Sequence, residues 1–470
     1  MIKRRWRSIY LLALFVFVFI WSYVQPYSVA PDEAMKFDVI HYLVNNNALP
    51  DGRDASIRNP IWGISYAYQP YLSLMISALF MKITSFFTKN MQALVMAARL
   101  VNVFLITGIG FVAMKIGDEL LEKGEKILFV FLVTLLPGSL YLGTYVNNDV
   151  IALFSIACII YGWIRVYKYG WTKKRACFWG LSISLCALSY YNAYSYILCS
   201  MFFFVITALF LNGKKWDIKT LIKWGSLITF IVILFAGWWF VRNAILYDGD
   251  ILARETMKKM GELYAQNEYK PSKIFTPQRA GMTIGEMLLY VHGTNVNSHN
   301  YLITVFMSFI GVFGSMEIFP PGLISKLYLL FFFIAILGVF RNYTNIFGRS
   351  KKVVKKEIIG AGPTYLNTYT MQPIWKTYSL LHLTMVLASL ISALLAIWYS
   401  YANDYQAQGR YFMPALIPFM YFVVLGYRYL FGKLVKSEKL KFLIYIGISV
   451  VIACLALYCF AGVFYPYYYK

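Results

Sequence analysis

Apolar stretches close to 20 residues long recur along this chain from its first residues to its last, and they restrict what it can fold into. A helix needs about 20 apolar residues to cross the hydrocarbon core of a bilayer, and it satisfies its own backbone hydrogen bonds there. Of the 470 residues, 60% are hydrophobic and only 14% are charged. That is too little charge to cover a soluble protein of this length. The sequence therefore predicts an all-α polytopic membrane protein.

We expect eleven membrane-spanning helices in one membrane domain, residues 1–470. The first resembles the apolar core of a signal peptide, but we expect it to remain attached as a membrane helix. The expected connections include an outer loop at 25–90, a long outer loop at 243–321 and a basic cytoplasmic loop at 341–377. The predicted spans are residues 8–24, 91–114, 127–146, 148–168, 176–190, 193–211, 220–241, 322–340, 378–400, 411–430 and 441–463.

One further apolar stretch, residues 66–87, does not fit this scheme as a span. Lys and Arg gather in five clusters between apolar runs: "KRRWR", "RVYKYGWTKKRA", "NGKKWDIK", "GRSKKVVKKE" and "GKLVKSEKLK". Such clusters mark cytoplasmic loops, and all five fall on one face only if 66–87 stays outside. We therefore expect this stretch to lie at the outer membrane interface as an aromatic-rich amphipathic helix.

The net charge of +23 would favour a nucleic-acid partner if it formed one continuous patch. Its division among short loops instead indicates a membrane orientation signal and contact with anionic lipid headgroups. We expect a multi-pass protein of the cell membrane with no nucleic-acid partner. The six cysteines lie in or beside apolar runs without a C-x-x-C motif, so disulfides and thiolate metal sites are not expected.

Two adjacent acids, Asp32 and Glu33, follow the first predicted span in "APDEAMKFDVIHYL". Phe37, Ile40 and Val44 come after them at helical spacing, which predicts an amphipathic helix beside the membrane. Acids in the first turn of a helix stabilise its dipole. A carboxylate at the bilayer surface is also suited to take a proton from a hydroxyl nucleophile. The pattern leaves both interpretations open.

A second polar motif, "NND" at 147–149, lies at the outer end of the next pair of spans. Asn and Asp are common helix N-caps. In the functional alternative, Asn148 and Asp149 face Asp32 across one cavity. A divalent cation held by Asp32, Glu33 and Asp149 is a further alternative, and the histidines show no metal-ligand spacing.

Basic residues also lie near the outer helix ends, with Arg242 in "GWWFVRN" and Arg410 in "QGRYFMP". Long basic side chains at such positions often extend to the interface. Two arginines can also hold a phosphate by charge-assisted hydrogen bonds. Arg99 lies inside the predicted span 91–114, where it needs a carboxylate partner or a polar cavity.

Taken in order, "PDE" with its amphipathic helix, "NND", "GWWFVRN" and "QGRYFMP" resemble the motifs of bacterial GT-C-type membrane glycosyltransferases. The resemblance is closest to a poorly characterised multi-pass branch and covers most of the chain. It implies an enzyme that takes a sugar from a polyprenyl-phosphate carrier on the extracytoplasmic face. The implied acceptor is a cell-envelope polysaccharide or teichoic acid.

The resemblance also implies roles for single residues. Asp32, with Glu33 and Asp149 beside it, would be catalytic, and Arg242 and Arg410 would hold the lipid phosphate. We therefore expect Asp32, Asp149, Arg242 and Arg410 to line one outward-opening cavity. Relatives often carry a basic residue or "PP" where this chain has "YQPY", and Gln69 has no charge with which to pair a phosphate. The further candidates for substrate binding are Arg99, His41, Asn148, Gln69 and Tyr411.

The absence of a Gly-rich nucleotide-binding loop agrees with a lipid-linked donor. The predicted reaction is an inverting glycosyl transfer without an organic cofactor. A lipid-sugar flippase is the alternative from another class, and it needs charges at several membrane depths and often repeated halves. A polysaccharide polymerase or ligase is a third reading, in which the early "PDE" has no function.

Overall fold

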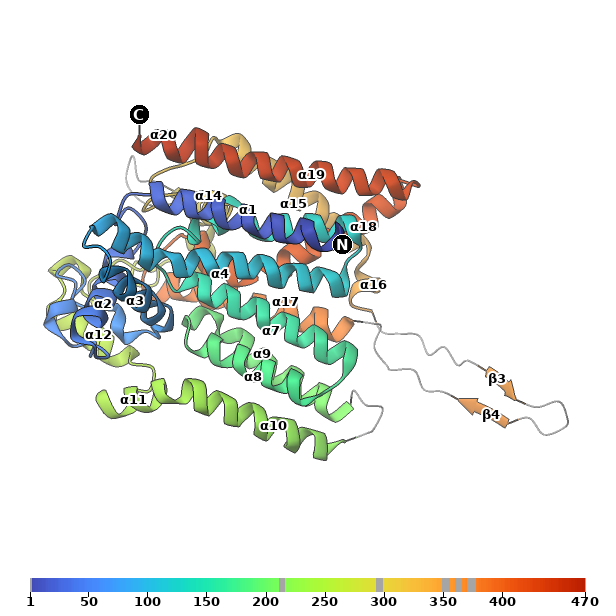
Figure 1. The fold of residues 1–470 in the computed structure, drawn as a ribbon, viewed down its shortest axis with the longest axis horizontal. Coiled ribbons are helices and arrows are strands. Elements are labelled where there is room, and N and C mark those ends of the chain that lie inside the picture. Colours follow the sequence, from blue (N-terminus) through green and yellow to red (C-terminus); the bar gives the residue numbers. More distant parts are fainter. Residues whose placement is uncertain are drawn as a thin grey trace.

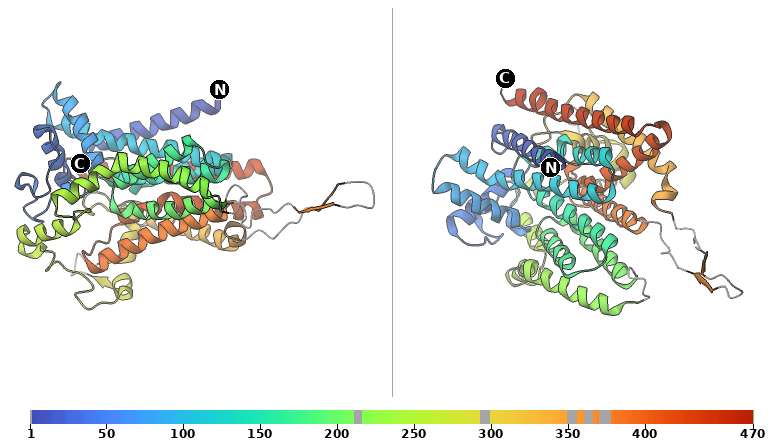
Figure 2. Two further views of the ribbon diagram at one scale, coloured as in Figure 1. Left: turned by 90° about the horizontal axis from the view of Figure 1, so that it is seen from below. Right: turned by 45° about the vertical axis from the view of Figure 1, so that its right-hand side comes forward.

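Long helices run side by side along the longest axis of the molecule, and shorter helices gather at one end (Figures 1 and 2). The computed structural model describes residues 2–210, 216–292, 299–348, 356–359, 366–369 and 378–469. Within them the structure is almost entirely helical, which confirms the predicted all-α polytopic membrane fold.

The elements have the following bounds. The long helices are α1 (Ile2–Val24), α4 (Met91–Leu120), α7 (Asp149–Tyr169), α9 (Tyr194–Phe210), α10 (Ile218–Val232), α15 (Gly322–Arg341), α17 (Ser379–Ala402), α18 (Leu416–Leu434) and α19 (Glu438–Tyr458). The shorter helices are α2 (Glu33–Asn46), α3 (Leu72–Ser85), α5 (Lys123–Thr134), α6 (Pro137–Leu142), α8 (Lys173–Ala187), α11 (Trp238–Leu246), α12 (Arg254–Tyr264), α13 (Ile284–Leu289), α14 (Tyr301–Gly311), α16 (Tyr343–Ile346) and α20 (Tyr465–Tyr468). Two antiparallel strand pairs are β1 (Val291–His292) with β2 (His299–Asn300) and β3 (Lys356–Ile359) with β4 (Leu366–Tyr369).

Nine helices in the described part of the chain are long and apolar enough to cross a membrane, compared with the eleven spans predicted. The two that fall short are the predicted spans 127–146 and 176–190. The first is divided into α5 and α6 at Pro137, whose ring and missing N–H are not compatible with a helix interior. The second is α8, which has 15 residues and begins at Lys173. Helix α10 has the same length, but a π-helical segment (Ile233–Gly237) continues it into α11, so that Ile218–Leu246 is long enough to span.

Ion pairs at one end of the bundle fix the directions of the first helices. Arg7, near the start of α1, lies 2.7 Å from Asp118 near the end of α4, and Lys126 of α5 lies 2.6 Å from Asp118. Helices α1 and α4 are therefore antiparallel, and the chain between them leaves and re-enters at the opposite end. Residues 66–87 do not traverse the bundle, as the distribution of basic loops predicts.

The same end of the bundle carries further basic side chains in ion pairs. Arg165 and Lys168 both contact Glu119, and Arg428 contacts Glu125. The predicted basic loop 341–377 lies largely outside the described residues, as do residues 211–215 of the cluster before α10.

Close helix packing in the bundle depends on small residues. Gly338 of α15 and Gly426 of α18 face each other, and a Cβ added at Gly338 would lie 2.4 Å from the carbonyl oxygen of Gly426. A Cβ at Gly426 would lie 2.0 Å from the carbonyl oxygen of Ala335. Small residues allow two backbones to approach in this way inside a membrane.

The topology predicts which loops an impermeant thiol reagent reaches in intact cells. We expect Lys123→Cys, at the exposed start of α5, to resist labelling, because the basic clusters predict that this end of the bundle faces the cytoplasm. Ala280→Cys, exposed between α12 and α13, should be labelled readily. The parent protein gives the background from its own cysteines. If Lys123→Cys were labelled and Ala280→Cys were protected, the orientation of the protein in the membrane would be opposite to the predicted one.

Candidate active site

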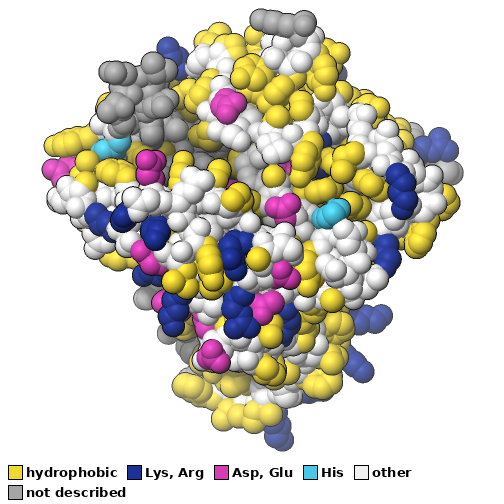
Figure 3. Space-filling model, turned by 90° about the vertical axis from the view of Figure 1, so that its left-hand side faces the viewer, with side chains coloured by type: hydrophobic (Ala, Val, Ile, Leu, Met, Phe, Trp, Pro, Cys, Tyr) yellow, Lys and Arg dark blue, Asp and Glu magenta, His cyan; other side chains and the backbone are white. Residues whose placement is uncertain are grey.

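The residues singled out in the sequence lie mainly at the end of the bundle formed by the shorter helices. Lys and Arg side chains are mixed with Asp and Glu across this face (Figure 3). The two adjacent acids at the start of α2 lie here, and the structure gives them different surroundings.

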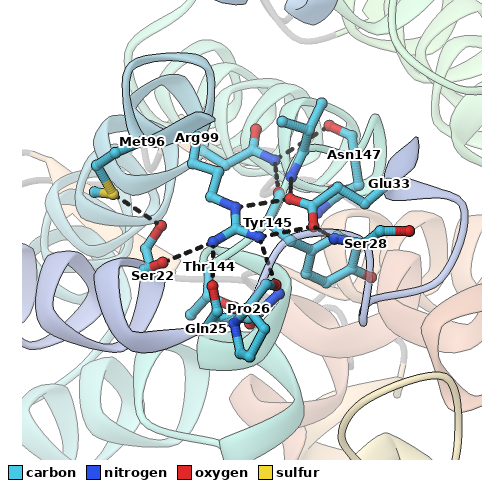
Figure 4. A network of polar contacts seen from close by, with 12 residues as sticks. Ser22, Gln25, Pro26, Ser28, Glu33, Met96, Arg99, Thr144, Tyr145 and Asn147 are labelled. Atoms are coloured by element: carbon cyan, nitrogen blue, oxygen red, sulfur yellow. Dashed lines mark hydrogen bonds and ion pairs between the residues drawn. The ribbon is translucent and has the colours of Figure 1, made fainter. Parts of the chain in front are cut away.

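Glu33 forms a buried ion pair with Arg99 of α4 (Figure 4). The Arg99 Nε and Nη2 atoms each lie 2.7 Å from a different carboxylate oxygen. The Glu33 side chain is fully buried and that of Arg99 is 2% exposed. The remaining Arg99 donors bind the backbone carbonyls of Ser22, Gln25 and Pro26.

The other lone pairs of the Glu33 carboxylate are also used. Its oxygens accept the backbone N–H groups of Ser28 at 3.1 Å and Val146 at 3.1 Å. The pair therefore connects the end of α1, the start of α2, α4 and the segment before α7. In this arrangement neither Glu33, predicted to be catalytic, nor Arg99, predicted to bind substrate, has a free polar atom to offer. Their contacts favour a structural role for both.

Asp32 does not cap the helix that it precedes. Its backbone is in the left-handed region at φ 61°, and its side chain makes no capping hydrogen bond. Asp tolerates this conformation better than most residues. The carboxylate instead lies 2.8 Å from Nη2 of Arg410, so the capping interpretation is wrong for Asp32.

Arg410 reaches this position from η7 (Gly409–Ala415), the short 3₁₀ helix that precedes α18. A Cβ at Gly409 would lie 2.1 Å from the backbone nitrogen of Phe309 in α14. Glycine therefore allows η7 to lie close enough to α14 to place Arg410 beside Asp32. Arg410 Nη2 also donates to the hydroxyl of Tyr411 at 3.0 Å.

The electrostatic surroundings keep Asp32 ionised. Burial raises the pKa of its carboxyl, but the positive charges of Arg410 and Lys36 lower it further, to about 2. The side chain is 28% exposed. A carboxylate with this pKa is charged at neutral pH, and it is a weak proton acceptor while Arg410 stays paired with it.

The three residues of "NND" have three different surroundings. Asn147 accepts the N–H of Val150 at 3.1 Å and so acts as the cap. Asn148 donates to the carbonyl of Pro70 and accepts from Ser73, which attaches α3 to α7. Only Asp149 faces Asp32, Lys36 and Arg410, and its buried Oδ1 has no hydrogen-bond partner among the described residues. Of the four residues predicted to converge, Asp32, Asp149 and Arg410 lie in one cluster.

Lys36 belongs to the same cluster and was not recognised in the sequence. It lies one helical turn after Asp32 on α2, with Nζ 3.9 Å from the Asp32 carboxylate and 4.7 Å from the centre of the Tyr66 ring. Its side chain is only 4% exposed. Burial lowers the pKa of its ammonium group, and the charge of Asp32 opposes that effect. The four-residue spacing from Asp32 was the available signal.

Tyrosines from separate parts of the chain surround these charges. Tyr66 and Tyr411 lie within electrostatic range of both Asp32 and Arg410, as does Tyr145 before α7. Tyr399 of α17 faces Asp32 as well. The cluster thus combines charges with hydroxyl groups that both donate and accept hydrogen bonds.

Arg242 does not belong to this cluster, so the prediction that it converges on Asp32 is wrong. Its Nη2 donates to the carbonyl of Pro50 at 2.7 Å, and its charged and polar neighbours are Asp51, Tyr71 and Tyr247. Backbone carbonyls of the outer loop attract its guanidinium away from the Asp32 site.

Two other candidates are placed apart from the charges. His41 is exposed on α2 and contacts Asn45. Gln69 has a buried Oε1 without a hydrogen-bond partner in the described chain, and nothing places it against Asp32 or Arg410.

A divalent cation does not fit Asp32, Glu33 and Asp149 as arranged. No group of three or more His, Cys, Asp or Glu side chains suited to a metal occurs among the described residues. Glu33 is saturated by Arg99, and Asp32 and Asp149 already face two cationic side chains.

The fold is similar to that of an oligosaccharyltransferase from Archaeoglobus fulgidus. The apo form of that enzyme and this chain share 12% identity with a TM-score of 0.54, and the match covers 96% of this chain and 55% of the enzyme. The complex of the archaeal AglB enzyme with an inhibitory peptide and a dolichol-phosphate gives 11% identity and a TM-score of 0.54, with the same coverage. The enzyme tethered to an acceptor peptide shares 12% identity with a TM-score of 0.52, over 96% of this chain and 54% of that one.

This chain thus spans about half the length of those solved relatives. No curated protein sequence matches it. A family model described as a predicted membrane protein (DUF2142) matches residues 53–420.

The geometry predicts that Glu33 and Arg99 stabilise the fold. Glu33→Gln removes the negative charge and leaves Arg99 buried without its partner, which should cost about 3–5 kcal/mol of unfolding free energy. Asp38→Asn is the matched control, because it makes the same change at an exposed position of α2 and should cost less than about 0.5 kcal/mol. Thermal unfolding of the purified protein in detergent measures both. Equal stability of the two variants would show that the ion pair does not hold the outer end together.

Proposed function

The chain belongs to the DUF2142 family of predicted membrane proteins, and we propose that it is a GT-C-type glycosyltransferase of the cell membrane. It would move a sugar from a polyprenyl-phosphate carrier to an extracytoplasmic acceptor. The observation that carries this proposal is the contact of Asp32 with Arg410, an acid and a cation beside the further carboxylate of Asp149. The fold of a dolichol-phosphate-binding oligosaccharyltransferase supports a lipid-linked donor.

In the proposed reaction, Asp32 takes the proton of an acceptor hydroxyl as its oxygen attacks C1 of the sugar. The bond between C1 and the phosphate oxygen breaks on the opposite face, and the electron pair leaves with the polyprenyl phosphate. The configuration at C1 is inverted. Arg410 stabilises the negative charge of the departing phosphate, which is an electrostatic contribution to catalysis.

The proposed acceptor is a cell-envelope polysaccharide or teichoic acid, and the reaction would take place on the extracytoplasmic face. The placement of the site opposite the basic end of the bundle supports this orientation. A flippase is less well supported, because the ion pairs of the described helices gather at the two ends of the bundle rather than along a path through it.

Asp32→Asn tests the proposal. The amide keeps the size of the side chain but removes the charge and the basic oxygen, so transfer should fall by roughly 100-fold or more. The assay is release of polyprenyl phosphate from a radiolabelled lipid-linked sugar by the purified protein. Asp38→Asn, on the same helix but exposed, is the control and should retain activity. Full activity of Asp32→Asn would remove Asp32 from the mechanism.

A further inference from the structure

Two cationic side chains flank Asp32, Lys36 at 4% and Arg410 at 11% exposure, and both have donors that no described residue uses. Lys36 has a contact of 3.9 Å with the Asp32 carboxylate and faces the Tyr66 ring, but its ammonium makes no hydrogen bond to the described residues. The Nε of Arg410 is buried and has no hydrogen-bond partner there either. Buried charges with unused donors are costly, so their persistence points to an anionic ligand.

A lipid phosphate suits these two donors, both as the diester of the sugar donor and as the monoester that the reaction releases. An arginine fork binds two phosphate oxygens, and a lysine supplies a compact positive charge beside them. In the resting structure, however, the cavity that Arg410 lines with Pro31 and Tyr145 has a volume of about 30 Å³. That is room for about two water molecules, so a phosphate would approach Arg410 from the other side, where the Asp32 carboxylate is 28% exposed.

The geometry of glycosyl transfer sets the distance between the base and the departing phosphate. A base lies about 2.6–3.2 Å from the attacking oxygen, and that oxygen lies about 3–3.5 Å from the reacting carbon. The phosphate leaves from the far side of that carbon, so base and phosphate are separated by about 6 Å or more. The contact with Asp32, at 2.8 Å, uses Nη2 of Arg410. Both forks of a guanidinium contain this nitrogen, so a phosphate held by two parallel hydrogen bonds competes with Asp32 for Arg410.

We propose that the Asp32–Arg410 ion pair is a latch that the donor phosphate opens. The phosphate takes Arg410 from Asp32 and gains Lys36 as its second cation, and the released Asp32 carboxylate turns to the acceptor hydroxyl. This inference rests on the proposed function and adds an order to it: donor binding precedes activation of the base. Before the donor binds, Arg410 pairs with Oδ2 of Asp32 and lowers the basicity of the carboxylate.

The latch makes an unusual prediction about binding. Asp32 competes with the phosphate for Arg410 and repels it, so Asp32→Asn should bind the phosphate more tightly, by roughly tenfold. Lys36→Met removes one charge-assisted contact and should bind roughly 10- to 100-fold more weakly. The same substitution removes a poorly paired buried charge, so the unliganded Lys36→Met protein should unfold at the same temperature as the parent or higher.

The experiment measures the unfolding temperature of the full-length protein in detergent during titration with farnesyl phosphate, since a ligand that binds the folded state raises it. Farnesol and inorganic phosphate are titrated in parallel to separate the isoprenoid from the phosphate. Arg242→Met is the matched control, because it removes an outer-face arginine that binds Pro50 instead of Asp32, and it should leave farnesyl phosphate binding unchanged.

Tighter binding by Asp32→Asn, together with weaker binding by Lys36→Met, supports the latch. Unchanged or weaker binding by Asp32→Asn overturns it, as does normal binding by Lys36→Met. An equal response to inorganic phosphate overturns the assignment to a lipid. None of these measurements requires sugar transfer. If the binding pattern holds while no transfer is found, the glycosyltransferase proposal fails and the lipid-phosphate site remains.

Discussion

The bidentate ion pair between Glu33 and Arg99 is the contact on which the outer end of this protein depends. It places a carboxylate and a guanidinium where water does not reach, and five backbone groups complete the hydrogen bonds that the pair leaves open. Burial of two charges is favourable only with such complete pairing. Since those groups come from the end of α1 and the segment before α7, the pair fixes where α2 begins.

The position of α2 explains why two acids stand side by side. Successive residues at the start of a helix point about 100° apart, given 3.6 residues per turn. With Glu33 turned inward to Arg99, Asp32 is directed to another side. Asp32 stands at the N-cap position with a left-handed backbone, and its side chain makes no capping hydrogen bond. One acid is therefore used to build the site and the neighbouring acid faces Arg410.

Most of the membrane-spanning helices could be predicted from the sequence, because the length of an apolar run and the charge of a loop are local properties. The sequence predicted that residues 66–87 do not span the membrane. It also predicted that Asp32, Asp149 and Arg410 come together, although it included Arg242 with them. It did not reveal Pro137 as a division between two short helices. It also did not pair Glu33 with Arg99, because a partner 66 residues away leaves no local pattern.

Long-range contacts also explain two other differences between the sequence predictions and the structure. Lys36 is in sequence an ordinary polar position between the apolar residues of an amphipathic helix. It is buried in the structure, where η2 (Tyr66–Tyr68) packs against α2 and the Tyr66 ring covers its ammonium group. Arg242 stands at an outer helix end as Arg410 does. The carbonyl groups of the loop before η1 (Ala55–Ile57) capture it, and nothing in its own neighbourhood in the sequence predicts that contact.

The charge balance of the candidate site shows why its charged groups are stable beside one another. Two carboxylates, Asp32 and Asp149, face two cations, Lys36 and Arg410, so the cluster is close to neutral where burial makes net charge expensive. A phosphate that enters adds negative charge, and Arg410 cannot pair fully with both the phosphate and Asp32. The pairing of Asp32 with Arg410 that stabilises the site would therefore have to be given up in the proposed reaction. An acid and a cation that were kept apart would avoid this cost, but each would then be buried without its counter-charge until the substrate arrived.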